Sequence, residues 1–253
     1  MNVIEKILQE LKEDAEVREV RIGPFWTAVW SRYCGLSSTV YEHEHSAGPP
    51  VAEAGKLKKK SALELCSYAG SDSTLERSVA LAAVNSLIEV DRSACRNINA
   101  SELLIKHGRG KKICVVGHFP FVPQLEKAAA DLWVLERRPR LNDLPADQAE
   151  RFLPQADIAA ITGTALLNGT MDTLLSLCRK DALIVVLGPT TPLMPAWFEY
   201  GVDIISGTRV ADPAFVLDMV SQGVIFSQFK GRGVKLLSMA NSAYEKTGFD
   251  QQG

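Results

Sequence analysis

The chain has 253 residues, which is enough for one large domain or two smaller ones. Its formal net charge of -2 at pH 7 gives no indication of nucleic acid or an anionic membrane as a partner. Hydrophobic residues make up 46% of the chain, yet no apolar run is long enough to span a bilayer. The start at Met1 has an amphipathic helical pattern rather than that of a signal peptide, so we expect a cytoplasmic protein.

The first part of the chain predicts a small α+β unit. Gly23-Pro24 separates two apolar runs and predicts a hairpin. Ser61 and Glu64 have the spacing of a capping box, and Ser71 or Asp72 is the expected cap of a longer helix. The expected elements are a helix over 2–16, strands over 17–22 and 25–31, a polar loop over 35–51, and helices over 61–68 and 71–90.

From Ile113 onward, short apolar strands alternate with helices, which predicts a doubly wound parallel sheet of the Rossmann kind. Within 113–120, four apolar residues run into Gly117, as in a strand buried on both faces. A connecting helix over 100–107 places the boundary near 97–110, so we expect domains over 1–98 and 99–253. The expected strands are 113–116, 132–135, 158–161, 183–187 and 203–205, and the expected helices are 121–130, 171–178 and 212–221.

The five cysteines are far apart, odd in number, and form no Cys-x-x-Cys pair. This pattern argues against a disulfide framework or a structural zinc site. Cys114 falls in a predicted buried strand and Cys178 on the apolar side of a predicted helix. We expect both to act as small buried hydrophobic residues.

Polar residues and glycines follow most of the predicted parallel strands. In an open parallel sheet, ligands bind beyond the carboxyl ends of the strands, where the strand order reverses. Glycines let a ligand approach the backbone, and hydroxyl and free N–H groups suit phosphate or carboxylate. Such turns also simply join strands to helices, but as a set they predict one cleft. The predicted ligand-binding residues are Gly117, His118, Phe119, Pro120, Glu136, Thr162, Gly163, Thr164, Asn168, Gly169, Thr170, Gly188, Pro189, Thr190, Thr191 and Arg209.

Three of these residues leave alternatives open. Glu136 stands where dinucleotide folds hold a ribose hydroxyl, but Gly117-x-x-Pro120 is not the Gly-x-Gly-x-x-Gly turn, and Pro120 lacks a donor. This argues against NAD and leaves a nucleoside open. His118 is either an acid/base catalyst or a helix cap. Asn168 either caps the helix that follows or lines the cleft together with Thr190, facing His118.

The segment 41–45 holds the one cluster of metal-ligand residue types in the sequence. In an extended segment, His43 and His45 would point the same way. Glu53 or a cysteine such as Cys34 could supply a third ligand. The alternative is a solvated polar loop.

Several motifs resemble the heavy-metal chelation family of prokaryotic proteins. The motifs cover 117–120, 156–172, 188–193, 200–203 and 207–213 in the second half, and 63–65 and 76–85 in the first. The resemblance implies an N-terminal domain like that of the enolase superfamily, a C-terminal Rossmann-like domain, and a cleft between the two. It also implies a role in metal handling, although 42–50 matches no motif of the family.

The leading hypothesis is a protein that binds a small anionic metabolite or a metal chelate in the interdomain cleft. Its bound group would be a metal ion or a nucleoside-containing ligand. The competing hypothesis is a nucleotide- or S-adenosylmethionine-dependent enzyme that uses His118 and Glu136. A structural partner protein is a third possibility and predicts a poorly formed cleft with a large apolar surface patch. Nucleic acid and membrane partners are not expected, and a homo-oligomer is left open.

Overall fold

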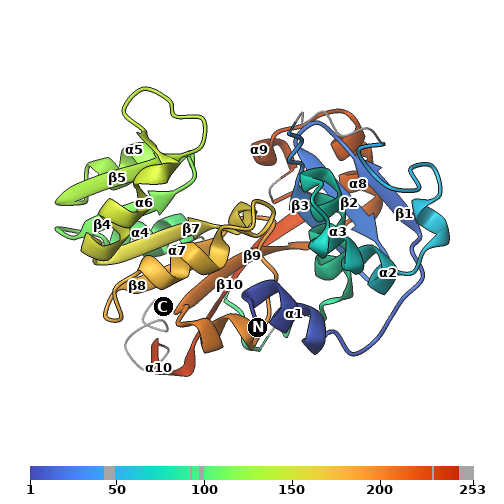
Figure 1. Cartoon of the computed structure of the whole chain (residues 1–253), viewed down its shortest axis with the longest axis horizontal. Helices are drawn as coiled ribbons and strands as arrows, with labels where there is room; N and C mark the ends of the chain where they lie inside the picture. The colour runs from blue at the N-terminus through green and yellow to red at the C-terminus, as the bar shows by residue number, and fades with distance from the viewer. Residues whose placement is uncertain (43–48, 92, 97–99, 230, 245–253) are drawn as a thin grey trace.

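The computed structural model describes residues 1–42, 49–91, 93–96, 100–229 and 231–244. These residues form a three-stranded antiparallel sheet and a seven-stranded, mostly parallel sheet (Figure 1). The α-helices are α1 (Val3–Glu10), α2 (Ala62–Cys66), α3 (Thr74–Leu87), α4 (Ala100–His107), α5 (Val122–Glu126), α6 (Ala149–Phe152), α7 (Met171–Leu177), α8 (Pro213–Ser221), α9 (Phe226–Phe229) and α10 (Ser242–Tyr244). The strands are β1 (Glu19–Ile22), β2 (Trp26–Trp30), β3 (Cys34–Ser38), β4 (Lys112–Val116), β5 (Asp131–Glu136), β6 (Leu144–Pro145), β7 (Ile158–Thr162), β8 (Leu183–Leu187), β9 (Ile204–Val210) and β10 (Val234–Ala240).

The large sheet has the order β10-β9-β8-β7-β4-β5-β6. Strand β4 pairs in parallel with β5 on one side and with β7 on the other. Counted from β4 as the first strand, the six parallel strands run 3-2-1-4-5-6, the order of a doubly wound Rossmann sheet. The predicted fold class is therefore confirmed, and the strand order reverses between β4 and β7.

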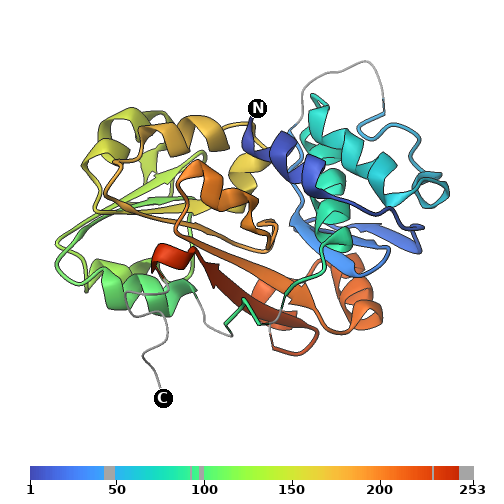
Figure 2. The ribbon, with the colours of Figure 1, turned by 90° about the horizontal axis from the view of Figure 1, so that it is seen from below.

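Helices cover both faces of the large sheet (Figure 2). Along β4, Ile113 and Val115 pack in the cluster that contains α4, whereas Cys114 and Val116 pack in the cluster that contains α6 and α7. This alternation is why the strand is apolar at every position after its first. Because both faces are buried, the carboxyl ends of the strands are the open edge that a ligand can reach.

The small sheet is a meander in which β2 pairs with β1 and with β3. On one face α3 lies so close to β3 that a Cβ on Gly35 would meet the carbonyl oxygen of Ala82 at 2.1 Å. The opposite face is covered by α8 and α9, where Leu36 packs with Val216 and Phe229. Helices α8 and α9, which come late in the chain, thus complete the hydrophobic core around the small sheet.

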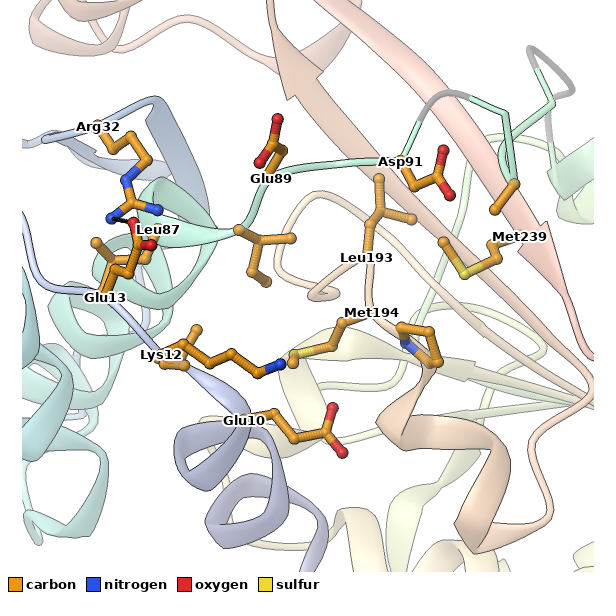
Figure 3. A pocket seen from close by; sticks show the side chains of 14 residues that line it. Glu10, Lys12, Glu13, Arg32, Leu87, Glu89, Asp91, Leu193, Met194 and Met239 are labelled. Carbon is orange, nitrogen blue, oxygen red and sulfur yellow. Dashed lines mark ion pairs between the residues drawn. The ribbon is translucent and has the colours of Figure 1, made fainter.

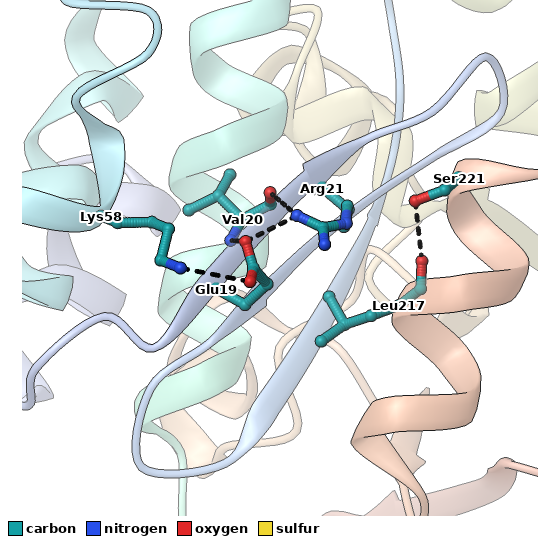
Figure 4. A network of polar contacts seen from close by, with 6 residues as sticks. All are labelled: Glu19, Val20, Arg21, Lys58, Leu217 and Ser221. Atoms are coloured by element: carbon teal, nitrogen blue, oxygen red, sulfur yellow. Dashed lines mark hydrogen bonds and ion pairs between the residues drawn. The ribbon is translucent and has the colours of Figure 1, made fainter.

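Figure 4 shows α8 running beside the β1–β2 hairpin. Next to it, Glu19 accepts hydrogen bonds from Arg21 at 2.6 Å and from Lys58 at 3.3 Å, which joins the hairpin to the segment before α2. The turn at Gly23 lies against the end of α8, since a Cβ there would meet the carbonyl oxygen of Val220 at 2.2 Å. The division into domains at residue 98 stays a prediction.

Several predicted bounds are wrong. The first helix ends at Glu10, before the charged residues that follow, and it begins with a capping box of Asn2 and Glu5. The cap of α3 is Ser73, because Ser71 instead donates its hydroxyl to Glu76. The predicted helix over 121–130 stops at Glu126, since the backbone of 128–130 is hydrogen-bonded to the segment before β4.

Three strands, β3, β6 and β10, were not predicted. The two-residue strand β6 pairs in parallel with β5. Strand β3 lies in part of the segment that was expected to be a polar loop, and β10 pairs antiparallel with β9 along its whole length. The pairing with β10 extends β9 to Val210, so that residues predicted to end this strand are part of it. Every helix among the described residues is too short or too polar to cross a membrane.

Candidate functional site

A cavity of about 640 Å³ lies at the open edge of the large sheet, over the point where the strand order reverses. Its walls come from the segments after β4, β5, β7 and β8, from Trp26 and Ser38 of the small sheet, and from Phe226 of α9. All the predicted ligand-binding residues line it except Gly163, Gly169, Thr191 and Arg209. Whether the lining residues bind a ligand stays a prediction.

His118 follows β4 and is paired with a carboxylate that sequence reasoning missed. Its Nδ1 lies 3.1 and 3.0 Å from the two carboxylate oxygens of Asp143, whose side chain is only 4% exposed. Asp143 also accepts a hydrogen bond from the backbone N–H of Arg140 at 3.0 Å. Asn142, with a positive φ of 75°, shapes the turn, and the pair Asn142-Asp143 is a turn signal in the sequence.

The pairing leaves one ring nitrogen for a ligand. When Nδ1–H donates to Asp143, Nε2 is the remaining polar atom, and no hydrogen bond to it is found among the described residues. Nε2 accepts a proton or a metal ion when the ring is neutral and donates to an anion when the ring is protonated. The His118 side chain is 20% exposed and lines the cavity.

Glu136 has a structural task at the end of β5. One carboxylate oxygen accepts from the backbone N–H of His118 at 3.0 Å, and the other accepts from the N–H of Arg137 at 2.7 Å. Both oxygens therefore bind the backbone that follows the strand ends. The carboxylate fixes the start of the His118 loop, and its bonds to the backbone leave fewer lone pairs for a ribose hydroxyl.

Four hydroxyl groups connect the two sheets at one side of the cavity. Thr162 donates to Thr164 at 3.1 Å, and the Thr164 hydroxyl lies 3.4 Å from that of Ser38. Thr190 accepts from the Ser38 backbone N–H at 2.9 Å and donates to its hydroxyl at 3.1 Å. These bonds join the end of β3 to the ends of β7 and β8, which places Ser38 in the wall.

Side chains of α3 brace the same junction. Asn85 donates to the carbonyl oxygen of Leu36 at 2.8 Å and to that of Thr190 at 3.3 Å. Arg77 donates to the carbonyl oxygen of Leu167 at 3.1 Å. Both residues belong to the segment 76–85 that carried the family resemblance, so part of that motif positions the loops of the cavity.

The cation at the cavity is Arg137, not Arg209. Arg209 lies within β9 opposite Lys235 and does not line the cavity, because β10 extends the strand past the sheet edge. The Arg137 guanidinium donates to the side-chain oxygen of Asn168 at 2.9 Å and lies 2.5 Å from a carboxylate oxygen of Glu42. Asn168 is therefore not a helix cap, a role that its position before α7 left open.

The glycines of the set have different positions. Gly188, with a φ of 115°, has open space where a Cβ would project, and it lines the cavity. A Cβ on Gly163 would lie 2.4 Å from the hydroxyl oxygen of Thr191, which is itself buried. This tight contact explains why Gly163 and Thr191 lie behind the wall. Gly169, with a φ of 69°, approaches Arg77 instead.

The metal site suggested by the sequence receives no support from its expected third ligands. His43 and His45 lie outside the described residues. Burial raises the pKa of the Cys34 thiol to about 12, and Glu53 forms an ion pair with Lys60 at 2.7 Å. Across the described parts of the chain, no three His, Cys, Asp or Glu side chains come together in a way that could hold a metal ion.

A separate cavity of about 340 Å³ lies between the end of α1 and the segment after α3 (Figure 3). Charged side chains such as Glu10, Lys12 and Glu89 surround it, and Arg32 forms an ion pair with Glu13 at 2.8 Å. None of the predicted site residues lines this cavity. The cavity at the edge of the large sheet is therefore the candidate site.

The strand order and the position of this cavity define a Rossmann-type α/β protein with a cleft at the switch point. The chain belongs to the DUF364 family, whose description is "Putative heavy-metal chelation" and whose sequence profile matches residues 99–239. The DUF4213 profile, which has the same description, matches residues 4–88. The resemblance seen in the sequence is thereby confirmed.

Relatives share the sequence and the fold. An uncharacterized protein of Methanocaldococcus jannaschii (MJ0500) is 33% identical over 156 residues, which are 59% of this chain and 60% of that protein. A DUF364 protein of unknown function from Desulfitobacterium hafniense is 25% identical, with a TM-score of 0.82 over 94% of this chain and 98% of its own. Another, from Pyrococcus horikoshii, is 23% identical, with a TM-score of 0.80 over 95% of this chain and 100% of its own.

Proposed function

We propose that the cavity binds a small anionic metabolite, or the metal chelate of such a molecule, for a role in metal handling. The observation that carries the proposal is the His118–Asp143 pair at the wall, with Nε2 left for a ligand. A histidine that donates its other ring N–H to a carboxylate is the usual arrangement of a metal-ligating histidine. The family description points in the same direction.

A chelate suits this cavity better than a bare ion. Tight protein sites for transition metals use three or four side-chain ligands. The cavity has one histidine, and both oxygens of Glu136 are bound to backbone N–H groups. A chelator would supply most of the metal ligands, and His118 would supply one more. The metal is then cargo that arrives with its organic ligand.

The surroundings of His118 suit the anionic part of such a ligand. Arg137 is half exposed and is oriented by Asn168, so it offers a guanidinium fork at the rim, where a ligand carboxylate could replace Glu42 as its partner. Thr164, whose hydroxyl accepts from Thr162 and lies 3.4 Å from that of Ser38, can turn its own hydroxyl proton to a ligand, and Gly188 lets the ligand come close to the backbone. Cation, hydroxyls and bare backbone are the groups that bind carboxylate or phosphate.

A second candidate is an enzyme that uses His118 as a general base. A histidine oriented by a buried carboxylate is the arrangement that this chemistry requires. An enzyme that binds an adenosyl ribose through Glu136 is the weaker alternative, because that carboxylate already accepts from three backbone N–H groups. Turnover of a bound ligand, lost in His118→Ala, would identify the enzyme.

Isothermal titration with three titrants tests the proposal: nickel(II) alone, nitrilotriacetate alone, and nickel nitrilotriacetate, which leaves coordination positions open on the metal. We expect the chelate to bind tightest and His118→Ala to weaken it about tenfold or more. His107→Ala is the matched control, because His107 is bonded to Tyr244 and lines neither cavity described above. Absence of binding by chelate and chelator at millimolar concentration, or equal binding by His118→Ala, would remove the proposal.

A further inference from the structure

Another cavity, of about 420 Å³, adjoins the candidate site and is called the second cavity below; it is distinct from the cavity in Figure 3. The two cavities share five wall residues, which are Phe119, Pro120, Gly188, Pro189 and Phe226. Beyond this common wall, the second cavity reaches over the sheet to Leu187 of β8 and Leu236 of β10. No sequence motif pointed to it, because its residues come from six separate parts of the chain.

The common wall is built from two phenylalanines on different elements. Phe119 follows β4 and stacks on Phe121 with ring centroids 5.1 Å apart and an interplanar angle of 15°. Phe226 begins α9 and lies 5.7 Å from the ring of Trp26. Both phenylalanines are partly exposed, and Gly188 beside them has open space where a side chain would project. The wall can therefore contact a ligand that lies on either side of it.

The second cavity is lined mainly by apolar groups. Leu187, Leu236, Phe121 and Ile225 contribute to it, and Ile225 is 54% exposed. One of its polar residues, Ser206, already has its hydroxyl bonded to that of Ser238 at 2.6 Å. Such a surface gains from contact with apolar ligand atoms and offers little to an ion.

We propose that the ligand is amphipathic and occupies both cavities. Its anionic or metal-bearing end lies at His118 and Arg137, and its aromatic or alkyl part passes between Phe119 and Phe226 into the second cavity. This inference rests on the proposed function, because it takes the first cavity as the site of the anionic end. The expected ligand is an anion with a sizeable apolar part. Small inorganic anions and short carboxylates are therefore not the preferred ligands.

Two sulfonates separate the contributions of the two cavities. Methanesulfonate has the anionic group alone, and 8-anilinonaphthalene-1-sulfonate adds an aromatic part large enough to reach the second cavity. We expect the larger anion to bind wild type about tenfold tighter or more, as measured by titration calorimetry and by its fluorescence. His118→Ala should lower the affinity for both anions.

Filling the second cavity provides the decisive comparison. Leu236→Trp and Ser227→Trp place a bulky ring at positions that line the second cavity and not the first. Each substitution should lower the affinity for the large sulfonate about tenfold and leave the affinity for methanesulfonate unchanged. Gln222→Trp, at an exposed neutral residue that lines neither cavity, controls for the added tryptophan. Ser227 is exposed, so its variant keeps the test valid should Leu236→Trp lower the melting temperature.

The outcomes distinguish this inference from the function on which it rests. An unchanged affinity for the large sulfonate in both filled variants, with loss in His118→Ala, would overturn the second cavity as a subsite and leave the proposed function intact. Sulfonate binding that is independent of His118, or no binding of either anion to wild type, would overturn this inference, and the proposed function falls with it only when the nickel nitrilotriacetate titration fails as well.

Discussion

At the scale of single residues, the pair of His118 and Asp143 decides which ring nitrogen stays available, because Nδ1 is bound to Asp143 and Nε2 has no hydrogen bond among the described residues. The sequence indicated His118 because it follows a glycine at the end of a predicted strand. It did not indicate Asp143, which lies 25 positions further on in a charged loop. Nothing local distinguishes a carboxylate that turns inward from one that stays in water. Partners of this kind depend on the path of a loop, which local patterns do not specify.

We predict that Asp143→Asn weakens binding of nickel nitrilotriacetate about tenfold to a hundredfold, the range found when a carboxylate behind a metal-binding histidine is changed. The amide cannot orient the ring by charge, so the preference for a proton on Nδ1 should also decrease. Long-range nitrogen–proton NMR correlations of the imidazole report this tautomer directly. Asp147→Asn is the matched control, because Asp147 lines the cavity without a bond to His118. Equal effects of the two substitutions would contradict the assigned role of Asp143.

Asn168 gives a second prediction at this scale. Its side-chain oxygen accepts from Arg137, which is half exposed, and it caps no helix. We therefore expect Asn168→Ala to change the free energy of unfolding by less than about 0.5 kcal/mol, the range of most surface substitutions. The affinity for an anionic ligand should fall severalfold, because the Arg137 guanidinium loses the contact that orients it. Urea denaturation and ligand titration measure the two effects. A loss of stability of about 1 kcal/mol, the size expected for a cap, with unchanged affinity would contradict this account.

At the scale of elements, five of the seven strands of the large sheet were predictable because each contains a short apolar run bounded by glycine or polar residues, whereas β6 and β10 were missed. Strands β8 and β4 and helix α4 match their expected positions to within a residue. Strand β3 was missed because Cys-Gly-Leu-Ser-Ser has neither alternation nor several β-branched residues. Its conformation comes from pairing with β2 and from the helix α3 packed against it.

The contact between β3 and α3 predicts a strong effect of one methyl group. In Gly35→Ala the new Cβ would lie 2.1 Å from the carbonyl oxygen of Ala82 and 2.4 Å from the backbone nitrogen of Ser86. Relief requires the helix to move, so we expect a loss of about 1–3 kcal/mol in the free energy of unfolding. Gly70→Ala is the control, because Gly70 is exposed and nothing lies within 4 Å of its Cβ position. Chemical denaturation of both variants tests this packing, and equal stabilities would contradict it.

At the scale of the whole molecule, late segments of the chain pack against the small sheet that its first part forms. The small sheet is covered on one face by α3 and on the other by α8 and α9, which come more than a hundred residues later. The sequence predicted helix α8 from Asp212 and Pro213 but not where it packs, because that contact is long-range. Helix α1, from the start of the chain, contacts helix α7 beside the large sheet, because the Val3 N–H donates to Asp172 at 2.9 Å.

This interlocking predicts one cooperative unfolding transition. Unfolding of the small sheet removes the partner of α8, and unfolding of the large sheet removes α8, α9 and the loops that Asn85 and Arg77 bind. Differential scanning calorimetry should therefore give a single peak with equal calorimetric and van't Hoff enthalpies. Two resolved transitions would show that the parts on either side of residue 98 unfold independently, contrary to this expectation.

The central claim is that His118 supplies one ligand to a metal chelate in the cavity. Electron spin-echo envelope modulation of the protein with copper(II) iminodiacetate tests it most directly, because the remote nitrogen of a coordinated imidazole gives a characteristic signal. The account predicts this signal in wild type and in His107→Ala, and its loss in His118→Ala. The same imidazole signal in His118→Ala, or none in wild type, would contradict the account.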